Sequence, residues 1–265
     1  RSDGQRIQRY RCKQCQKSFS QATDDPAYYQ KKRQLNHKCL MMLASTVSMR
    51  RTAIILSINP KTVARKLEWL SVQSQKKLAL QTNQLKTVTA IQFDELQTSE
   101  HSKCKPLSVA LAVSKDNRKI CGFYVSKMPA TGHLAAISRK KYGHRRDDRI
   151  KGLRQLFKQL QSFLDPEIAI DSDDCAYYPN IVNHYFPKAN YSQFKGNASA
   201  ISGQGELKKI RRDPLFAINH TLAMCRANIN RLIRKTWCTT KKIARLIDHL
   251  AIYAWVHNSR LTLTH

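Results

Sequence analysis

Two acidic residues stand near the ends of predicted β-strands, where their side chains could meet. The run "TVTAIQFDEL" is typical of a strand and carries Asp94 near its end, and the short apolar run "EIAIDSD" ends at Asp173. Carboxylate oxygens are the ligands that hard divalent ions take, and two-metal phosphoryl transfer needs a carboxylate shared between ions about 4 Å apart. If the two strands are neighbours, the pair predicts a site for Mg²⁺ or Mn²⁺.

The charge of the chain predicts a polyanionic partner. There are 47 Lys and Arg residues against 18 Asp and Glu residues, which gives a formal net charge of +29, and the basic residues are spread from end to end. Nucleic acid fits this distribution because its phosphates reward many scattered cations through counterion release. An acidic membrane fits less well, since no apolar run approaches the roughly 18 residues of a spanning helix.

The elements that must position the two acids follow one another in a recognisable order. Three β runs precede a long basic helical stretch, and a fourth strand, a helix, a fifth strand and closing helices come after it. These elements are expected at 87–96, 106–114, 118–127, 133–164, 167–173, 178–186, 189–194, 214–235 and 240–257. This is the order of an RNase H-like α/β domain, a mixed five-stranded sheet flanked by helices, in which the first and fourth strands are neighbours.

Four sequence motifs make this interpretation more specific. "FDE", "SDDCAYYP", "INHTLAMCRANINRLIRK" and "DHLAIYAWVHNSR" resemble the catalytic core of bacterial insertion-sequence transposases of the DDE type, and the resemblance covers roughly residues 36–258. In that family the first acid is an Asp in an Asp-Glu pair, which selects Asp94. The second lies in a [S/T]-D-x-x-x-x-Y context, which selects Asp173. The third is usually a Glu with a base seven residues later, and here Asn219 is followed by Arg226.

The resemblance implies a role for each of these residues. Asp94 and Asp173 would hold Mg²⁺ for strand nicking and strand transfer, and Asn219 would complete the metal shell through its carbonyl oxygen. Arg226, two helical turns beyond Asn219, would bind a phosphate near the scissile bond. We therefore interpret the chain as a variant with Asn in the third catalytic position.

Other polar residues are secondary candidates for the same site. Glu206 is an alternative third ligand, although its seventh follower is an acid. Strand alternation points Glu95 away from Asp94, so a supporting or structural role is expected. His220 lies about 100° around the helix from Asn219 and is expected to be a buried, hydrogen-bonding histidine. Asn230 and Arg234 continue the basic stripe toward the DNA backbone. The aromatic residues Tyr177, Tyr178 and Trp237 are expected in the core, with stacking on DNA bases as the alternative.

Residues 36–70 predict a helix-turn-helix. "SMRRTAIILSI" begins at the cap Ser48, the turn "SIN" follows, and "NPKTVARKLEWL" begins with Asn59 as N-cap and Pro60 as first helical residue. The third helix would turn Val63, Leu67 and Leu70 inward. The residues expected to contact DNA in this module are Arg50, Arg51, Lys61, Thr62, Arg65 and Lys66. The alternative is a generic three-helix packing unit with a basic outer face.

The cysteines predict half of a zinc site. "RYRCKQCQKSF" holds Cys12 and Cys15 in a C-x-x-C pair, whereas a structural Zn²⁺ takes four ligands. The other pair is expected upstream of Arg1, although His37 and Cys39 could complete the site, and two ordinary reduced thiols are the alternative. The remaining cysteines are irregularly placed, which favours a reducing compartment over a disulfide framework.

These expectations define a domain plan and a function. We expect a zinc-ribbon half and basic arm at 1–35, the helix-turn-helix at 36–72, a helical linker at 73–86 and the RNase H-like catalytic domain at 87–265. The expected function is a metal-dependent DNA transposase of the bacterial cytoplasm, associated with the nucleoid, that binds double-stranded element ends as a homodimer or higher oligomer. The alternatives are an inactive transposase-derived DNA-binding protein or repressor, and an RNase H-like nuclease without strand transfer.

Overall fold

The computed structural model describes residues 8–20, 22–85, 88–195, 213–233 and 237–262, which form two compact units, residues 1–38 and 39–265. Two of the predicted site residues, Glu206 and Arg234, lie outside the described residues. Within these residues, no helix is both long enough and apolar enough to cross a membrane.

The first unit is built around a short hairpin. The strands β1 (Arg9–Arg11) and β2 (Ser18–Ser20) pair antiparallel, and Tyr10 stacks on Phe19 with ring centroids 5.5 Å apart. The 3₁₀ turn η1 (Arg33–Leu35) follows the hairpin. The hairpin turn carries the C-x-x-C pair, so the sequence motif coincides with a tight, hydrogen-bonded turn.

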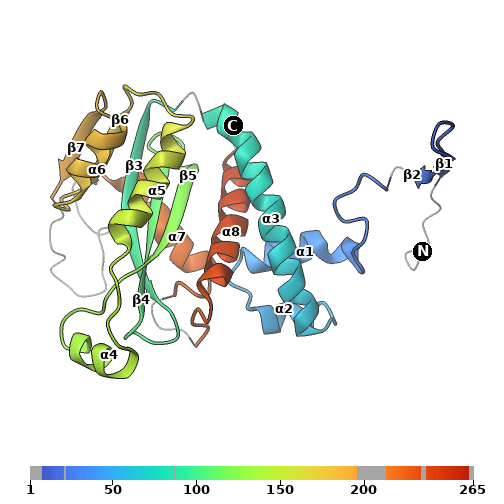
Figure 1. The fold of residues 1–265 in the computed structure, drawn as a ribbon, viewed down its shortest axis with the longest axis horizontal. Helices are drawn as coiled ribbons and strands as arrows, with labels where there is room; N and C mark the ends of the chain where they lie inside the picture. The colour runs from blue at the N-terminus through green and yellow to red at the C-terminus, as the bar shows by residue number, and fades with distance from the viewer. Residues whose placement is uncertain (1–7, 21, 86–87, 196–212, 234–236, 263–265) are drawn as a thin grey trace. The chain divides into compact units, whose positions relative to one another are not determined.

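Three helices follow, and the third is longer than the helix-turn-helix requires. They are α1 (Asn36–Leu43), α2 (Met49–Ile55) and α3 (Pro60–Leu85). The caps are those expected, since the backbone N–H of Arg51 donates to Ser48 and that of Lys61 donates to Asn59, at 3.3 and 2.8 Å. The expected linker is helical but is not separate, because α3 continues unbroken and packs along α8 (Ile243–Thr262) (Figure 1).

The sheet has the strand order expected of an RNase H-like domain. Its strands are β3 (Ala90–Ser99), β4 (Pro106–Ser114), β5 (Ile120–Lys127), β6 (Ala169–Asp173) and β7 (Asn190–Phe194), arranged β5-β4-β3-β6-β7. The first three strands are antiparallel neighbours, and β6 and β7 add in parallel with β3. The expected adjacency of the first and fourth strands is confirmed, because β6 pairs directly with β3.

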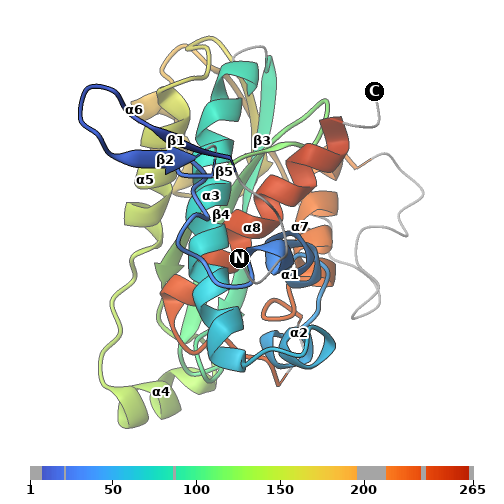
Figure 2. The same cartoon turned by 90° about the vertical axis from the view of Figure 1, so that its right-hand side faces the viewer.

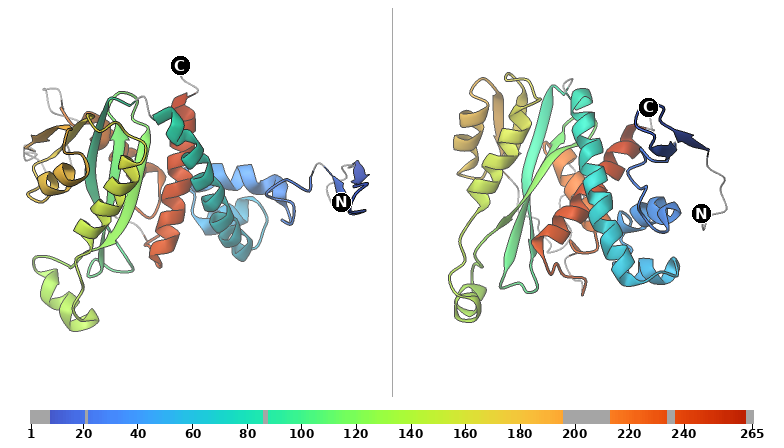
Figure 3. Two further views of the ribbon diagram at one scale, coloured as in Figure 1. Left: turned by 45° about the horizontal axis from the view of Figure 1, so that its top comes forward. Right: turned by 45° about the vertical axis from the view of Figure 1, so that its right-hand side comes forward.

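Helices cover both faces of this sheet (Figures 2 and 3). The helices α5 (Arg149–Gln161) and α6 (Tyr178–Tyr185) pack over one face in a cluster that contains Phe93 and Phe157. The helices α7 (Phe216–Asn228) and α8 pack over the other face in a cluster that contains Leu111 and Leu222. The buried side chain of Asn258 ties α8 to the edge strand through two hydrogen bonds with the backbone of Ile120, at 2.8 and 3.0 Å.

Two predicted helices have different bounds in the structure. The stretch 133–164 forms α4 (Leu134–Tyr142) and α5 rather than one helix, because Gly143 ends α4 at a φ of +73° that favours glycine. The helix expected at 214–235 is shorter, since α7 ends at Asn228 and the chain turns extended at Ile229.

Candidate active site

The sheet brings the two predicted aspartates together at one point. The strands β3 and β6 run parallel with Phe93 opposite Ser172, so Asp94 and Asp173 follow as the next residues on each strand. Asp173 is the last residue of β6, and beyond it the chain leaves the sheet. Asp94 and Asp173 therefore lie where β6 ends and β3 continues.

The electrostatics of Asp94 reflect this crowding. Burial, with the nearby charges of Asp173 and Glu95, raises the pKa of its carboxyl to about 7, although a backbone hydrogen bond and the charge of Arg226 act in the opposite direction. That bond is donated to Asp94 by the N–H of Glu95, at 2.6 Å. The proximity of Asp173 and the charge of Arg226 thus both act on this carboxyl, as a metal and phosphate site would require.

Asp173 is short of favourable partners. Burial, Glu95 and Asp174 all raise the pKa of its carboxyl. Its Oδ1 atom is buried and has no hydrogen-bond partner in the described part of the chain. A buried acceptor without a donor is costly, and a hard divalent cation would satisfy it. The donor chemistry of the Asp94 and Asp173 pair therefore fits a metal of the Mg²⁺ or Mn²⁺ class.

Glu95 points to the opposite face of β3, as strand alternation predicts. Its carboxylate accepts hydrogen bonds from Ser108 Oγ at 2.6 Å, from the Tyr178 hydroxyl at 3.4 Å and from the Tyr177 hydroxyl. Ser108 lies on the neighbouring strand β4, opposite Gln97, whereas the two tyrosines come four and five residues after Asp173 in the chain. Glu95 thus anchors the segment that carries Asp173, and sequence reasoning missed the hydroxyl donors because they lie on separate elements.

Gln92 fixes the start of α7 against the sheet, and sequence reasoning missed it. Its side chain accepts from the N–H of Ile218 at 3.1 Å and donates to the carbonyl of Pro214 at 2.7 Å and to Asp171 at 3.2 Å. Gln92 shares a face of β3 with Asp94, because the two are separated by one residue. A buried amide two positions before the first acid was the available signal.

The other acid of β6 is already paired. Asp171 forms a salt bridge with Lys115 at 2.7 Å and has 5 % of its surface exposed. A carboxylate whose charge is already balanced is a poorer metal ligand than Asp173, whose buried oxygen has no donor within the described residues. The geometry thus favours Asp173 over Asp171, as the sequence context did.

On α7, the structure places Asn219 and Arg226 differently. The amide of Asn219 donates to Asp213 Oδ2 at 2.9 Å, so its side chain is oriented by the residues just before the helix. The charge of Arg226 reaches the first aspartate and lowers its pKa. Both lie on the helix that packs over the Asp94 face of β3, and the charge of Arg226 acts on that carboxyl.

His220 lies beside a cation rather than beside the acids. Its ring stands 3.2 Å from the guanidinium of Arg118 and 5.4 Å, centroid to centroid, from Phe216. Burial and Arg118 lower the pKa of the imidazole, which favours the neutral ring as a hydrogen-bond acceptor. This is the setting of a structural histidine.

Among the described residues, no group of three or more His, Cys, Asp or Glu side chains is placed to hold a metal ion. The predicted catalytic set contains two aspartates and an asparagine, so it falls below that count. The predicted zinc pair supplies two thiols on one turn, where the N–H groups of Cys15 and Gln14 lower the pKa of Cys12 toward the thiolate that a zinc ligand needs. Cys39 is fully buried and is not available as a surface ligand.

The predicted DNA contacts of the helix-turn-helix are exposed with one exception. Lys66 has only 3 % of its surface exposed, and burial lowers the pKa of its ammonium group. It cannot present its charge to DNA in this structure, because α3 packs on that side as well as on the side of Val63 and Leu67. The exposed or half-exposed members of the predicted set are Arg50, Arg51, Lys61, Thr62, Arg65, Arg226 and Asn230.

Of the three aromatic residues expected in the core, one lies outside it. Tyr178 is buried against Phe93, with ring centroids 4.7 Å apart, and Tyr177 packs partly buried against the same cluster. Trp237 is fully exposed, so the expectation for this residue was wrong. Residue type alone did not separate a packed aromatic side chain from an exposed one.

A groove of about 700 Å³ begins at this site. Glu95 and Arg226 stand at one end, and the second half of β3, the segment after β5 and the turn after α7 line the rest. Arg231, which was not predicted as a functional residue, lines it too. The continuation of the basic stripe beyond Arg226 was the only sequence signal for it.

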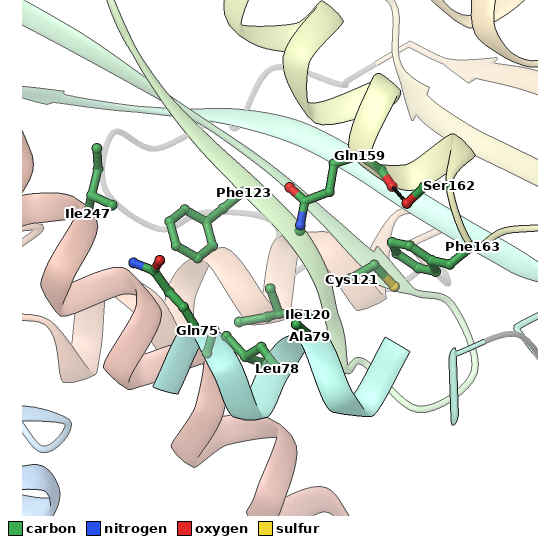
Figure 4. Close-up of a pocket in the computed structure, with 12 residues that line it drawn as sticks. Gln75, Leu78, Ala79, Ile120, Cys121, Phe123, Gln159, Ser162, Phe163 and Ile247 are labelled. Atoms are coloured by element: carbon green, nitrogen blue, oxygen red, sulfur yellow. Dashed lines mark hydrogen bonds between the residues drawn. The ribbon is translucent and has the colours of Figure 1, made fainter. Parts of the chain in front are cut away.

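A second cavity, of about 490 Å³, lies between α3, β5, α5 and α8 (Figure 4). The described residues that line it include Leu78, Ile120, Phe123 and Phe163, with Gln75 and Gln159 as the larger polar side chains, and none is Asp, Glu, Lys, Arg or His. Burial raises the pKa of the lining thiol Cys121 to about 12, so this thiol is protonated. The cavity offers apolar surface and no group for acid, base or metal chemistry.

Comparisons with known proteins give limited information. No family model and no curated protein matches the chain. Among solved structures, one match is the crystal structure of a pre-cleavage Mos1 transpososome, at 9 % sequence identity, covering 88 % of this chain and 77 % of that chain with a TM-score of 0.27. At so low a TM-score, this likeness supports no conclusion about the chain, and the interpretation of the site depends on its own geometry.

Proposed function

We propose that the chain is a metal-dependent DNA transposase that cleaves and transfers DNA strands at element ends. The observation that carries this proposal is the pair of carboxylates from two adjacent parallel strands, Asp94 and Asp173, one of which has a buried oxygen without a donor within the described residues. The net charge of +29 supports DNA as the substrate. The resemblance of the sequence motifs to insertion-sequence transposases supports the reaction type.

Each residue has a distinct part in the proposed mechanism. Asp94 and Asp173 would hold the divalent ion, and Asn219 would add a neutral oxygen ligand. When bound, such an ion activates a water or a 3′ hydroxyl and stabilises the leaving oxygen. Arg226 would bind the phosphate beside the scissile bond, because a guanidinium donates two parallel hydrogen bonds to phosphate oxygens. Glu95 would keep the segment after Asp173 in place through its tyrosine partners.

The proposal is tested by cleavage of DNA that carries an element end. The wild-type protein is expected to nick this DNA with Mg²⁺ or Mn²⁺, and Asp94→Ala is expected to bind it equally well without nicking. Glu167→Ala removes an exposed acid at the other end of β6 and should nick like the wild type. Binding without any nicking by the wild type would favour the second candidate, an inactive transposase-derived DNA-binding protein or repressor.

The third ligand needs its own test, because Asn219 is neutral. Asn219→Ala should lower the nicking rate and leave DNA binding nearly intact. A matched Glu206→Ala variant should nick normally. If instead Glu206→Ala loses activity while Asn219→Ala keeps it, the third ligand is Glu206.

A further inference from the structure

The groove that starts at the candidate active site follows a free strand edge. In the described part of the chain, β6 pairs with β3 only over Ala90–Phe93, whereas β4 pairs with the other edge of β3 along its whole length. From Glu95 to Ser99 the outer edge of β3 therefore forms part of the groove lining. The bridge between Glu100 and Thr240 marks the far end of this edge.

Cations dominate the charged lining of this groove. Arg226, Arg231 and Lys103 line it against one acid, Glu95, whose carboxylate already accepts from three hydroxyls. These hydrogen bonds hold the Glu95 side chain on the face of β3 opposite Asp94. The net charge of the lining is positive, so the groove is complementary to an anion. The backbone of a peptide strand that paired with the β3 edge would offer these cations no negative charge.

Arg231 is the most distinctive of these cations, because it is only partly exposed and forms no salt bridge within the described residues. One of its terminal nitrogens contacts the sulfur of Met49 at 3.5 Å, a weak acceptor, and its carbonyl accepts from Thr98. Its Nε is buried with no hydrogen-bond partner among the described residues. Burial lowers the pKa of the guanidinium, and the charges of Cys238 and Asp248 compensate only in part because Arg245 opposes them.

The size of the groove fits a polymer strand. The edge from Glu95 to Ser99 is about 13 Å long at about 3.3 Å per residue, a length that can lie beside a short run of two or three consecutive phosphates of one strand, on the order of 6 Å apart. The volume of about 700 Å³ lies within the range of about 300–1,000 Å³ that is usual for ligand sites. The hydroxyls of Ser99 and Ser102 add donors along the same lining.

We infer that this groove binds a single DNA strand by its phosphates, with Arg231 as the main contact, and leads that strand to Asp94 and Asp173. The inference extends the proposed function to a specific path for one strand. It assigns a binding role to the end of β3, which the sequence motifs did not indicate, and to Arg231 in the turn after α7, next to the predicted contact Asn230. Positively charged grooves of this kind are how proteins follow single strands without reading their sequence.

The first test measures binding without catalysis. A fluorescent single-stranded oligonucleotide of about 12 nucleotides is titrated in EDTA at several salt concentrations. Arg231→Gln is expected to weaken binding about tenfold, and Lys103→Ala two- to threefold, each with a salt slope lower by about 0.7. Lys158→Ala removes an exposed lysine from α5 and should change the slope by clearly less. If Arg231→Gln, Lys103→Ala and the control Lys158→Ala all show the same salt slope, the inference is wrong.

A second measurement locates the strand and covers the case that Arg231→Gln folds poorly. A photocrosslinking residue is placed at the exposed Thr131 in the groove and, as a control, at Lys158. We expect crosslinks to the oligonucleotide from the first position and few from the second. Equal crosslink yields from the two positions would contradict the inference. Salt slopes that the groove variants leave unchanged would contradict it too, and this is the result expected if the groove binds a peptide instead.

These results separate the inference from the proposed function. If the wild type nicks DNA but Arg231→Gln and Lys103→Ala bind the oligonucleotide like the wild type, the function stands and the groove assignment falls. If the wild type never nicks DNA but the binding differences are seen, the groove assignment stands and the transposase proposal falls.

Discussion

The two cavities of the larger unit differ in the chemistry of their walls. The pocket between α3, β5 and α5 has apolar walls with amide groups and no charged side chain among its described lining residues, which is what helix packing against a sheet edge produces. The groove along β3 gathers Arg226, Arg231 and Lys103, and Glu95 in its lining directly follows Asp94, which like Asp173 is desolvated. Burying such charges opposes folding, so their position is better explained by a bound partner than by stability.

The largest expected effect follows from removing an acid at the groove end. Asp173→Ala should lower the cleavage rate about a thousandfold, because several kcal/mol of transition-state stabilisation is lost with a metal ligand. The melting temperature should stay equal or rise, because the variant removes a buried oxygen without a donor in the described part of the chain. Cleavage assays measure the rate, and thermal unfolding measures the melting temperature. If Asp173→Ala cleaves normally, Asp173 is not a catalytic residue.

The apolar pocket should give the opposite result. Ile120→Ala truncates a side chain with 4 % exposure on the edge strand, so we expect a loss of about 2–3 kcal/mol in the free energy of unfolding. The cleavage rate per folded molecule should be unchanged. Denaturant unfolding and cleavage at low temperature measure these quantities. If Ile120→Ala abolishes cleavage in folded protein, the pocket belongs to the active region and the comparison fails.

A smaller effect concerns pH. The Asp94 carboxyl has a pKa of about 7 in the fold, against 3.8 for the ordinary group, so the folded state binds the extra proton between these values. Stability of the metal-free protein should therefore fall as pH rises from about 4 to about 7. Asp94→Asn should show a weaker fall over this window, and Mg²⁺ should reduce the fall in the wild type. Identical pH profiles for wild type and variant would contradict the pKa of Asp94.

The smallest effect extends the comparison to the helix-turn-helix. Lys61→Ala and Arg65→Ala each remove an exposed cation and should weaken DNA binding about threefold to tenfold at moderate salt. Lys66→Met removes a buried one and should leave DNA affinity within about twofold. Gel-shift titrations of folded variants measure this, and an equal loss for all three would show that Lys66 is accessible after all.

Local patterns predicted the sheet well, and with it the adjacency of the strands that carry Asp94 and Asp173. Apolar runs between turn residues gave β3 to β7, and Asn117 does receive a hydrogen bond, at 3.0 Å, from the N–H of Lys119 at the predicted turn. These features depend on neighbours in the chain. The partnership of Asp94 and Asp173 was accessible because the order of elements fixes which strands are adjacent.

Features set by long-range packing were missed or wrong. Helical periodicity placed Lys66 on the outer face of α3, but a long helix that packs on two sides has no free face at that position. Gln92, Ser108 and Arg231 act through residues up to 182 positions away, and single-sequence patterns do not report such pairs. The third ligand remains a prediction from motif resemblance, since the described contact of Asn219 is with Asp213.

The unbroken course of α3 has a mechanical consequence. Its 26 residues make a rod of about 39 Å that starts with Lys61 and Arg65 and packs on α8 behind the sheet. If the first turns of α3 bind DNA, this straight helix holds the candidate active site at a fixed distance from the bound sequence. Nicks should then fall at a constant number of base pairs from the bound sequence.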